Sequence, residues 1–214
     1  MAYWKAIEAG YTVDSYVNLF LGNKISYHFL NKRLTKMQGN ALGIKVVQKE
    51  IPDQRKNKEL FEKSLLHIIK EIKLQGIHTI GGAYISETDY QHKILKRMCN
   101  KLRLKLFNPY LGRTSKDILE EIITLKIRAI ITAIDMRKLE KKWLGRTVNK
   151  HFLSHIIKNI DIDPLGDKGE YHTFVIDAPF FLKKINILKS EEKEALPKDY
   201  YLKIDAYSLI PKKL

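Results

Sequence analysis

The most informative part of the chain is a turn that leads into a strand-like run, Asp163-Pro164-Leu165-Gly166-Asp167-Lys168-Gly169-Glu170-Tyr171-His172-Thr173-Phe174-Val175-Ile176-Asp177-Ala178-Pro179. Two acidic residues, Asp167 and Glu170, stand three apart and flank Gly169. Carboxylates held in a tight turn attract a metal-bound phosphate, a cationic amine or ammonia. For Asp-Lys-Gly-Glu alone, a solvated hairpin turn is the plain structural alternative.

Upstream of this stretch, strand-like and helix-like segments alternate. Strand patterns cover 12–20, 44–48, 78–85 and 105–108, and helix patterns cover 27–42, 58–74 and 90–104. Alternation at this spacing predicts an α/β fold with a parallel sheet flanked by helices. Such sheets bind ligands at the carboxyl ends of their strands.

The pattern changes beyond Pro109. A capped helix is predicted from Thr114-Ser115, followed by a strand over 127–134, a charged segment, a helix over 149–160 and three late strands. The last strand, 201–210, alternates apolar and polar residues, which is typical of a half-buried antiparallel strand. We therefore expect an α/β domain over 1–110 and a smaller α+β domain over 111–214.

Composition limits the classes of partner. Lysine and arginine total 39 against 24 acids, a net charge of +15, which favours an anionic partner such as a nucleotide, a nucleic acid or an acidic protein. The excess is mostly scattered lysine without aromatic interleaving, so it indicates nucleic acid only weakly. The single cysteine, Cys99, excludes an internal disulfide and is predicted to be buried filler. No run approaches the ~20 apolar residues of a membrane span, and a cytoplasmic protein is expected.

The beginning of the chain is unusual for this fold class. Residues 2–10 look like the end of a helix that stops at Gly10. A parallel α/β domain normally opens on a strand whose following loop holds phosphates at a helix N-terminus. No such strand or glycine-rich loop precedes Ala2, so we expect either a truncated chain or a lost nucleotide site.

Several motifs in the same order resemble the diphthine–ammonia ligase family, within the N-type ATP pyrophosphatase (PP-loop) superfamily of HUP/Rossmann-like fold. The opening stretch is similar to the family's Asp-Pro-x-Gly-Glu-x-Gly-Glu-[Tyr/Phe]-His-Thr-x-Val-x-Asp-x-Pro, with Asp167 in place of the first glutamate and Glu170 matching the second. Further matches are Trp143-Leu144-Gly145-Arg146, Pro109-Tyr110-Leu111-Gly112-Arg113 (usually Pro-Leu-Trp-Gly-Arg), His28, Asn31, Leu34, Gln38, Ala41-Leu42-Gly43-Ile44, Gly82-Ala83, Ser86 and Tyr90-Gln91.

The resemblance implies an ATP- and Mg²⁺-dependent reaction. A carboxylate is activated as an acyl-adenylate, pyrophosphate leaves, and ammonia attacks to give an amide and AMP. In the named family the carboxylate belongs to diphthine on elongation factor 2. The family's Ser-Gly-Gly-Lys-Asp-Ser phosphate loop is missing here, which favours truncation ahead of Met1 and predicts that the chain as given binds ATP poorly and is inactive. The strand before that loop is central in the superfamily, so a gap or a forced pairing is expected between segments 12–20 and 78–85.

The resemblance assigns residue roles. Asp167 and Glu170 are the catalytic candidates, and would orient ammonia, the trimethylammonio group of the substrate or Mg²⁺. Tyr171 could add a cation–π contact worth roughly 0.5–2 kcal/mol, or could be a core residue. His172 and Thr173 face opposite sides of a strand, so only one can face the site.

The remaining candidates divide between substrate and nucleotide. Trp143, Gly145 and Arg146 could form a loop that contacts substrate, although a Trp at a domain interface is nearly as plausible. Arg113 could bind phosphate or pair with an acid. The residues matched to the nucleotide side are His28, Gly82, Ala83 and Ser86.

The sequence predicts no metal site, and it is compatible with two other functions. His151 and His155 lie four apart on a predicted helix, but no third ligand is evident, so no metal site is predicted. A non-catalytic binding protein that contacts a translation factor or RNA is the alternative function. The enzyme class could also act on another carboxylate or on a tRNA base.

Overall fold

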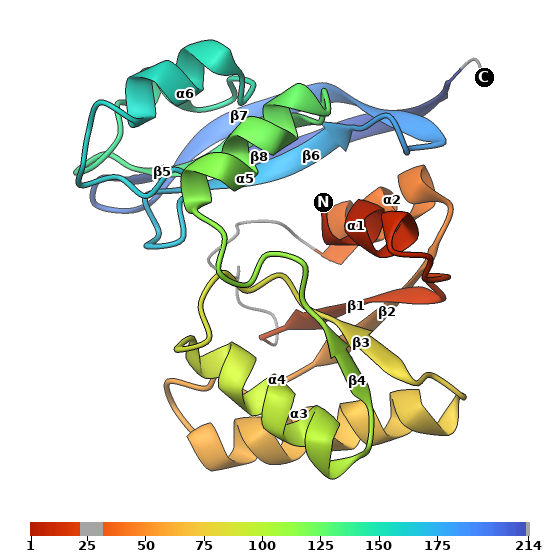
Figure 1. The fold of residues 1–214 in the computed structure, drawn as a ribbon. Helices are drawn as coiled ribbons and strands as arrows, with labels where there is room; N and C mark the ends of the chain where they lie inside the picture. The colour runs from red at the N-terminus through yellow and green to blue at the C-terminus, as the bar shows by residue number, and fades with distance from the viewer. Residues whose placement is uncertain (22–31, 213–214) are drawn as a thin grey trace. The chain divides into compact units, whose positions relative to one another are not determined.

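The computed structural model describes residues 1–21 and 32–212 and divides into two compact units (Figure 1). The first unit comprises Met1–Lys24 and Val47–Thr114, and the second comprises Ile25–Val46 and Ser115–Leu214. The segment around α2 therefore belongs to the second unit, which is the larger of the two rather than the smaller one expected.

The first unit contains three helices and most of four strands. These elements are α1 (Ala2–Glu8), β1 (Ser15–Phe20), β2 (Lys45–Glu50), α3 (Lys58–Leu74), β3 (Thr79–Gly81), α4 (Tyr90–Lys101) and β4 (Lys105–Phe107). Helix α3 begins where Asn57 caps it, since the Asn57 side chain accepts a hydrogen bond from the Leu60 N–H at 2.9 Å. The predicted 58–74 helix is confirmed at both ends.

The core of this unit lies between α3 and α4. It is built from Ile51, Phe61, Leu65, Ile69, Ile94, Leu95, Met98, Cys99 and Leu104. Cys99 is fully buried, and burial raises the pKa of its thiol to about 11, so the predicted filler role is confirmed.

The strands of the first unit form two separate pairs. One pair is β1–β2, and the other is the parallel pair β3–β4, in which Thr79 lies opposite Lys105 and Gly81 opposite Phe107. Among residues 1–21 and 32–212, no ladder joins β1 to β3, which is the gap predicted between segments 12–20 and 78–85. Strands β1 and β3 are both shorter than expected.

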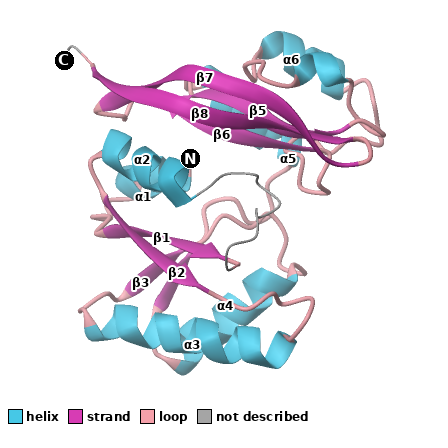
Figure 2. Ribbon diagram, turned by 180° about the vertical axis from the view of Figure 1, so that it is seen from behind, coloured by secondary structure: helices cyan, strands magenta, loops and turns pink. Residues whose placement is uncertain are grey.

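The second unit is built on one antiparallel sheet (Figure 2). Its elements are α2 (Lys32–Leu42), α5 (Ser115–Thr124), β5 (Arg128–Asp135), η1 (Lys141–Trp143), α6 (Lys150–Ile156), β6 (Tyr171–Asp177), β7 (Lys183–Leu196) and β8 (Asp199–Pro211). The strand order is β6-β5-β8-β7. Leu119 of α5 and Phe152 and Ile156 of α6 pack with the apolar side chains of β5 to form the core.

Helix α2 lies on the other side of this sheet from α6 (Figures 1 and 2). The Gln38 amide donates a hydrogen bond to the carbonyl of Val175 in β6 at 3.0 Å, and the Leu182 N–H donates to the carbonyl of Ala41 at 2.7 Å. Both bonds come from the C-terminal half of α2, and they hold it against β6 and the residue before β7.

Two details of the second unit differ from the expected pattern. Strand β5 contains a bulge at the fully buried Thr132, because Ile131 pairs with Thr173 and Ala133 pairs with His172. Helix α6 ends at Ile156 rather than near residue 160, and the Ile160 side chain, 96% exposed, has no core to pack against.

Among the described residues, no helix combines the length and apolar composition that a membrane crossing requires.

Candidate functional site

The loop before β6 is organised by Asp163. Its carboxylate accepts hydrogen bonds from the Leu165 N–H at 2.8 Å and, more weakly, from the Asp167 N–H at 3.4 Å. Its second oxygen accepts a hydrogen bond from the Ser115 hydroxyl at the start of α5, at 2.9 Å. Asp163 therefore fixes both the turn and its attachment to α5. This role of Asp163 was not predicted from the sequence, although an Asp-Pro pair that opens a turn is a recognised signal.

Glu170 closes the same loop from its other end. The side chain is only 2% exposed, and its two oxygens accept hydrogen bonds from the N–H groups of Asp163 and Lys168, at 2.9 and 3.1 Å. These bonds give both buried oxygens of Glu170 a hydrogen-bond partner within the loop. Glu170 is thus placed as a residue that holds the loop, whereas Asp167 is exposed on its surface.

The two glycines of the loop both adopt positive φ angles. Gly166 has φ +72°, and a Cβ at this position would lie 2.6 Å from the Tyr171 carbonyl oxygen. Gly169 has φ +87° and open space around it. Gly166 is therefore required by both backbone conformation and close packing, and Gly169 by conformation alone.

Tyr171 belongs to the core. It is 2% exposed, its ring meets the Phe152 ring edge to face at 5.2 Å, and its hydroxyl donates a hydrogen bond to the Pro164 carbonyl. Burial raises the pKa of Tyr171, and the charges of nearby Asp163, Glu170 and Asp167 raise it further, so the hydroxyl remains a donor. This settles the two roles left open for Tyr171: the residue is a core residue, and its ring is not available for a cation–π contact with a ligand.

The next two residues alternate as predicted. Thr173 is exposed, and His172 on the opposite face is half-buried. Both flank the bulge at Thr132 in the neighbouring strand. Thr173 and Asp167 are thus the solvent-facing members of the predicted set in this region.

Trp143 is also a core residue rather than a substrate-facing one. It is 5% exposed, and its ring lies 5.0 Å from the Phe152 ring, 4.9 Å from the His155 ring and 5.3 Å from the His151 ring. The two histidines that stand four apart therefore flank an indole. Among the described residues, no group of three or more histidine, cysteine or acidic side chains could hold a metal ion.

The residues after Trp143 follow β5. The Gly145 N–H donates to the Ile131 carbonyl at 2.8 Å, and the Ile131 N–H donates to the Arg146 carbonyl at 2.9 Å. Gly145 has φ +75°, which turns the chain toward these bonds. The Arg146 side chain is exposed, and it forms no ion pair with another described residue. Of the Trp143–Arg146 motif, Arg146 alone is placed to meet a ligand.

In the first unit, the segments that follow β3 and β4 are tied together by Asn108. Its side chain accepts a hydrogen bond from the Tyr84 N–H at 3.1 Å and donates one to the Tyr84 carbonyl at 2.9 Å. The buried His92 ring lies against both Tyr84 and Asn108. The roles of Asn108 and His92 were not predicted, since nothing in the spacing of these residues shows that the two segments meet.

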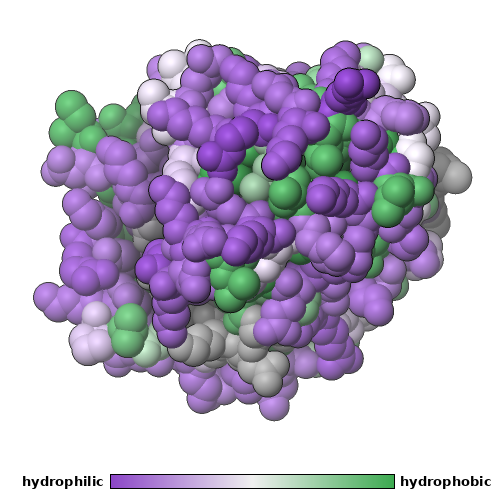
Figure 3. Space-filling view, turned by 90° about the horizontal axis from the view of Figure 1, so that it is seen from below, coloured by the Kyte–Doolittle hydropathy of each residue, from purple (hydrophilic) through white to green (hydrophobic). Residues whose placement is uncertain are grey.

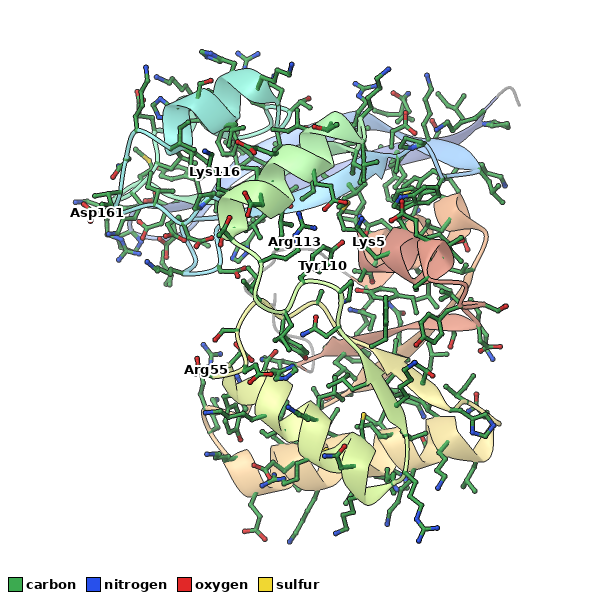
Figure 4. The ribbon with its side chains drawn as sticks, viewed as in Figure 1. Lys5, Arg55, Tyr110, Arg113, Lys116 and Asp161 are labelled. Carbon is green, nitrogen blue, oxygen red and sulfur yellow. The ribbon has the colours of Figure 1, made fainter. Side chains whose placement is uncertain are left out.

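The same two segments line an open hollow of about 460 Å³, bounded by Ile85, Ser86, Glu87, Leu111, Gly112 and Arg113. Figure 4 shows Tyr110 and Arg113 on the segment after β4, and the Arg113 guanidinium lies 5.9 Å from the centre of the Tyr110 ring. The hollow thus offers the Ser86 hydroxyl and the Arg113 guanidinium beyond the carboxyl ends of the parallel strands β3 and β4. Parallel sheets bind ligands at this end of their strands.

The predicted nucleotide residues fit this hollow only in part. Ser86 lines it, although its hydroxyl also bonds to Thr88. At Gly82, a Cβ would lie 3.0 Å from the Tyr84 ring, so internal packing explains this glycine without a ligand. Ala83 is exposed beside it, and His28 lies outside the described residues.

Two family models match successive parts of the chain. The model described as the diphthamide synthase N-terminal domain matches residues 1–106, and the model described as the diphthamide synthase C-terminal domain matches residues 114–210. The chain belongs to the diphthamide synthase family. This confirms the resemblance drawn from the motifs, and the α/β fold class with an antiparallel C-terminal sheet agrees with it.

Relatives in this family carry a common name. The diphthine–ammonia ligases of Homo sapiens and Mus musculus are each 34% identical over 137 residues, which covers 62% of this chain and 49% of each relative. The Schizosaccharomyces pombe diphthine–ammonia ligase is 28% identical over 136 residues, 62% of this chain and 22% of that protein. The chain spans about half the length of the mammalian relatives that it matches.

Proposed function

We propose that this diphthamide synthase family chain serves the ATP-dependent conversion of a protein-bound carboxylate, diphthine on elongation factor 2, into its amide with ammonia. The observation that carries the proposal is the match of both family domains in order, together with the reaction named in the relatives. The loop of residues 163–170 supports it, because this loop presents a carboxylate from a rigid turn.

In this proposal Asp167 is the group of the loop that meets the substrate. Asp163 and Glu170 hold the loop through their bonds to its own N–H groups, and Asp167 stands exposed between them. A carboxylate there attracts the trimethylammonio group of diphthine or an ammonium ion. In this proposal Glu170 has a positioning role, and Asp167 makes the direct contact with the substrate.

The nucleotide would lie at the hollow beside β3 and β4. Arg113 would hold a negatively charged group of ATP, and Ser86 would donate or accept one hydrogen bond. ATP, when bound, supplies the activation of the carboxylate and its leaving group. The described residues offer no carboxylate cluster for Mg²⁺, so no step is assigned to a metal held by side chains.

The test supplies a version of the protein that carries the family's Ser-Gly-Gly-Lys-Asp-Ser phosphate loop ahead of Met1, together with diphthine-bearing elongation factor 2, ammonium and Mg²⁺-ATP. The expected result is AMP release together with a mass change on the factor that replaces a carboxylate oxygen by an amide nitrogen. Asp167→Asn should lower the rate about 10- to 100-fold, equivalent to ~1.4–2.7 kcal/mol. Glu120→Gln, an exposed acid on α5, is the matched control and should leave it unchanged.

The outcomes separate the candidate functions. Binding of the factor without AMP or amide formation would contradict the ligase and favour the binding-protein alternative. AMP formation with a different carboxylate but not with diphthine would keep the reaction class and change the substrate.

A further inference from the structure

One end of the first unit gathers exposed cations that the sequence spreads over 36 positions. We call this group the basic end, and it consists of Lys70, Lys73, Lys101, Arg103 and Lys105. Lys70 and Lys73 come from the last two turns of α3, Lys101 and Arg103 from the end of α4 and the residue after its C-cap, and Lys105 is the first residue of β4. All five are exposed.

A hydrogen bond and a strand pairing bring these segments together. The Lys73 ammonium donates a hydrogen bond to the Leu102 carbonyl at 2.8 Å, which joins the end of α3 to the end of α4. Lys105 pairs with Thr79 at the start of the β3–β4 sheet. The basic end therefore lies at the amino ends of these two strands, and the Ser86–Arg113 hollow lies at their carboxyl ends.

Ion pairs with the described residues do not neutralise the charge of the basic end. None of its five members forms such a pair, and Lys105 instead lies 5.2 Å from the Tyr11 ring centre. Some other cations of the same unit are paired, since Lys49 meets Glu71 at 2.7 Å and Arg55 meets Asp53 at 2.7 Å. An unpaired group of five cations is available to an anionic partner.

Arg103 is held in a conformation that does not suit it. Its φ is +52°, at the second position after the last helical residue of α4, where glycine is the favoured residue. A side chain in this region costs stability that glycine would not. Lys126 has the same conformation after α5, so this strain does not distinguish Arg103 from a surface position, and Lys126 can serve as its matched control.

We propose that the basic end binds the phosphate backbone of single-stranded RNA. Protein interfaces are depleted in lysine and enriched in aromatic residues, whereas this group is lysine-rich and Leu74, 88% exposed, is the large apolar residue beside it. Figure 3 shows the face below α3 and α4 as mostly hydrophilic, with small separate hydrophobic areas. The Tyr11 ring beside Lys105 is half-buried and packs against Phe107, so binding rests on charge rather than on base stacking, and it is independent of base sequence and strongly dependent on salt.

A matched pair of variants tests this. Lys126 has φ +55° at the same place after α5 that Arg103 occupies after α4, and both N–H groups bond to the carbonyl three residues earlier, at 3.0 and 3.1 Å. Arg103→Gly and Lys126→Gly therefore remove one cation and relieve one strained backbone each. Both should raise the thermal midpoint by about 2–4 °C.

RNA binding should separate the two variants. The probe is a fluorescein-labelled mixed-sequence RNA of about 20 nucleotides, followed by anisotropy with the full chain. Between about 50 and 200 mM salt, Arg103→Gly should weaken binding roughly 3- to 10-fold and make the log–log salt slope shallower by about 0.7, while Lys126→Gly leaves both unchanged.

Three results would overturn the proposal. These are no RNA binding by the parent chain, equal loss in the two variants, or tighter binding of polyglutamate or of anionic lipid vesicles than of RNA at equal salt. The RNA-binding measurement does not involve the ligase reaction. Its outcome therefore tests this proposal independently of the proposed function.

Discussion

The carboxylates of Asp163, Asp167 and Glu170 lie within eight residues of each other but have different surroundings. The carboxyl oxygens of Asp163 and Glu170 accept hydrogen bonds from N–H and hydroxyl groups of the same unit, while the Asp167 side chain is exposed. Charged acceptors of backbone N–H groups form stronger hydrogen bonds than neutral ones. The loop is therefore rigid because of two acids and can present the third.

Glu170→Gln tests the positioning role of the buried acid. The amide supplies one acceptor where the carboxylate supplied two, so the N–H of Asp163 or Lys168 is left without a partner. The expected loss in the free energy of unfolding is about 1–3 kcal/mol, measured by urea denaturation. Asp167→Asn, at an exposed position, should change it by less than about 0.5 kcal/mol. Equal effects of the two substitutions would contradict the different roles.

Sequence patterns located this loop but could not rank its acids. Both Asp167 and Glu170 match polar positions of a turn, and nothing in their spacing shows that the oxygens of Glu170 meet the N–H groups of Asp163 and Lys168. Tyr171 and Trp143 were ambiguous for the same reason. Phe152 packs against both rings, and it comes from a helix whose partners the sequence does not state.

At the scale of elements, α2 is fixed at its C-terminal end by a close contact. Gly43 follows the helix with φ +76°, and a Cβ there would lie 2.5 Å from the Leu182 Cδ1. The adjacent Leu182 N–H bonds to the Ala41 carbonyl. The end of the helix and the start of β7 are thus in contact without room for a side chain at position 43.

Gly43→Ala should destabilise the second unit through both conformation and contact. The matched control is Gly76→Ala, since Gly76 has φ +84° and no atom within 4 Å of its ideal Cβ. The control should cost about 1–2 kcal/mol from the left-handed backbone alone. Gly43→Ala should cost about 1–3 kcal/mol more, from overpacking.

Urea denaturation of both variants gives this comparison. Adding Leu182→Ala to Gly43→Ala should recover part of the difference, because it removes the side chain that the new methyl group meets. Indistinguishable costs at positions 43 and 76 would show that the Leu182 contact does not restrict this site.

The elements themselves were predictable to different degrees. Helix α3 was correct at both ends, since Asn57 caps it and Phe61, Leu65 and Ile69 mark a continuous apolar face. Strand β3 was predicted over eight residues and has three, because a strand ends where its partner β4 ends, and pairing is not visible in a local pattern.

At the scale of the whole molecule, the carboxylates set the response to acid. Hydrogen bonds from the Arg55 side chain lower the pKa of Asp53 to about 2, and hydrogen bonds from lysines lower the pKa values of Glu59, Glu71, Glu140 and Asp205. Because these groups hold protons less tightly in the folded chain, the unfolded chain takes up protons first as the pH falls.

The free energy of unfolding should therefore fall steadily from about pH 5 toward pH 2. Protonation also adds to a net charge of +15, so self-repulsion acts in the same direction. Urea denaturation at successive pH values measures the decline. Asp53→Asn should make it shallower near pH 2–4, the range between the folded pKa and the ordinary value of 3.8. Stability that is constant or rising over this range would contradict the assignment.

The placement of α2 bears on how the gene can be divided. The family boundary between residues 106 and 114 suggests expressing two halves, yet Gln38 and Ala41 bond to residues 175 and 182. A C-terminal fragment cut at this boundary would lack the helix that covers one side of its sheet, and would expose apolar surface to aggregation. The same C-terminal fragment with residues 25–46 joined to its end should instead yield soluble protein.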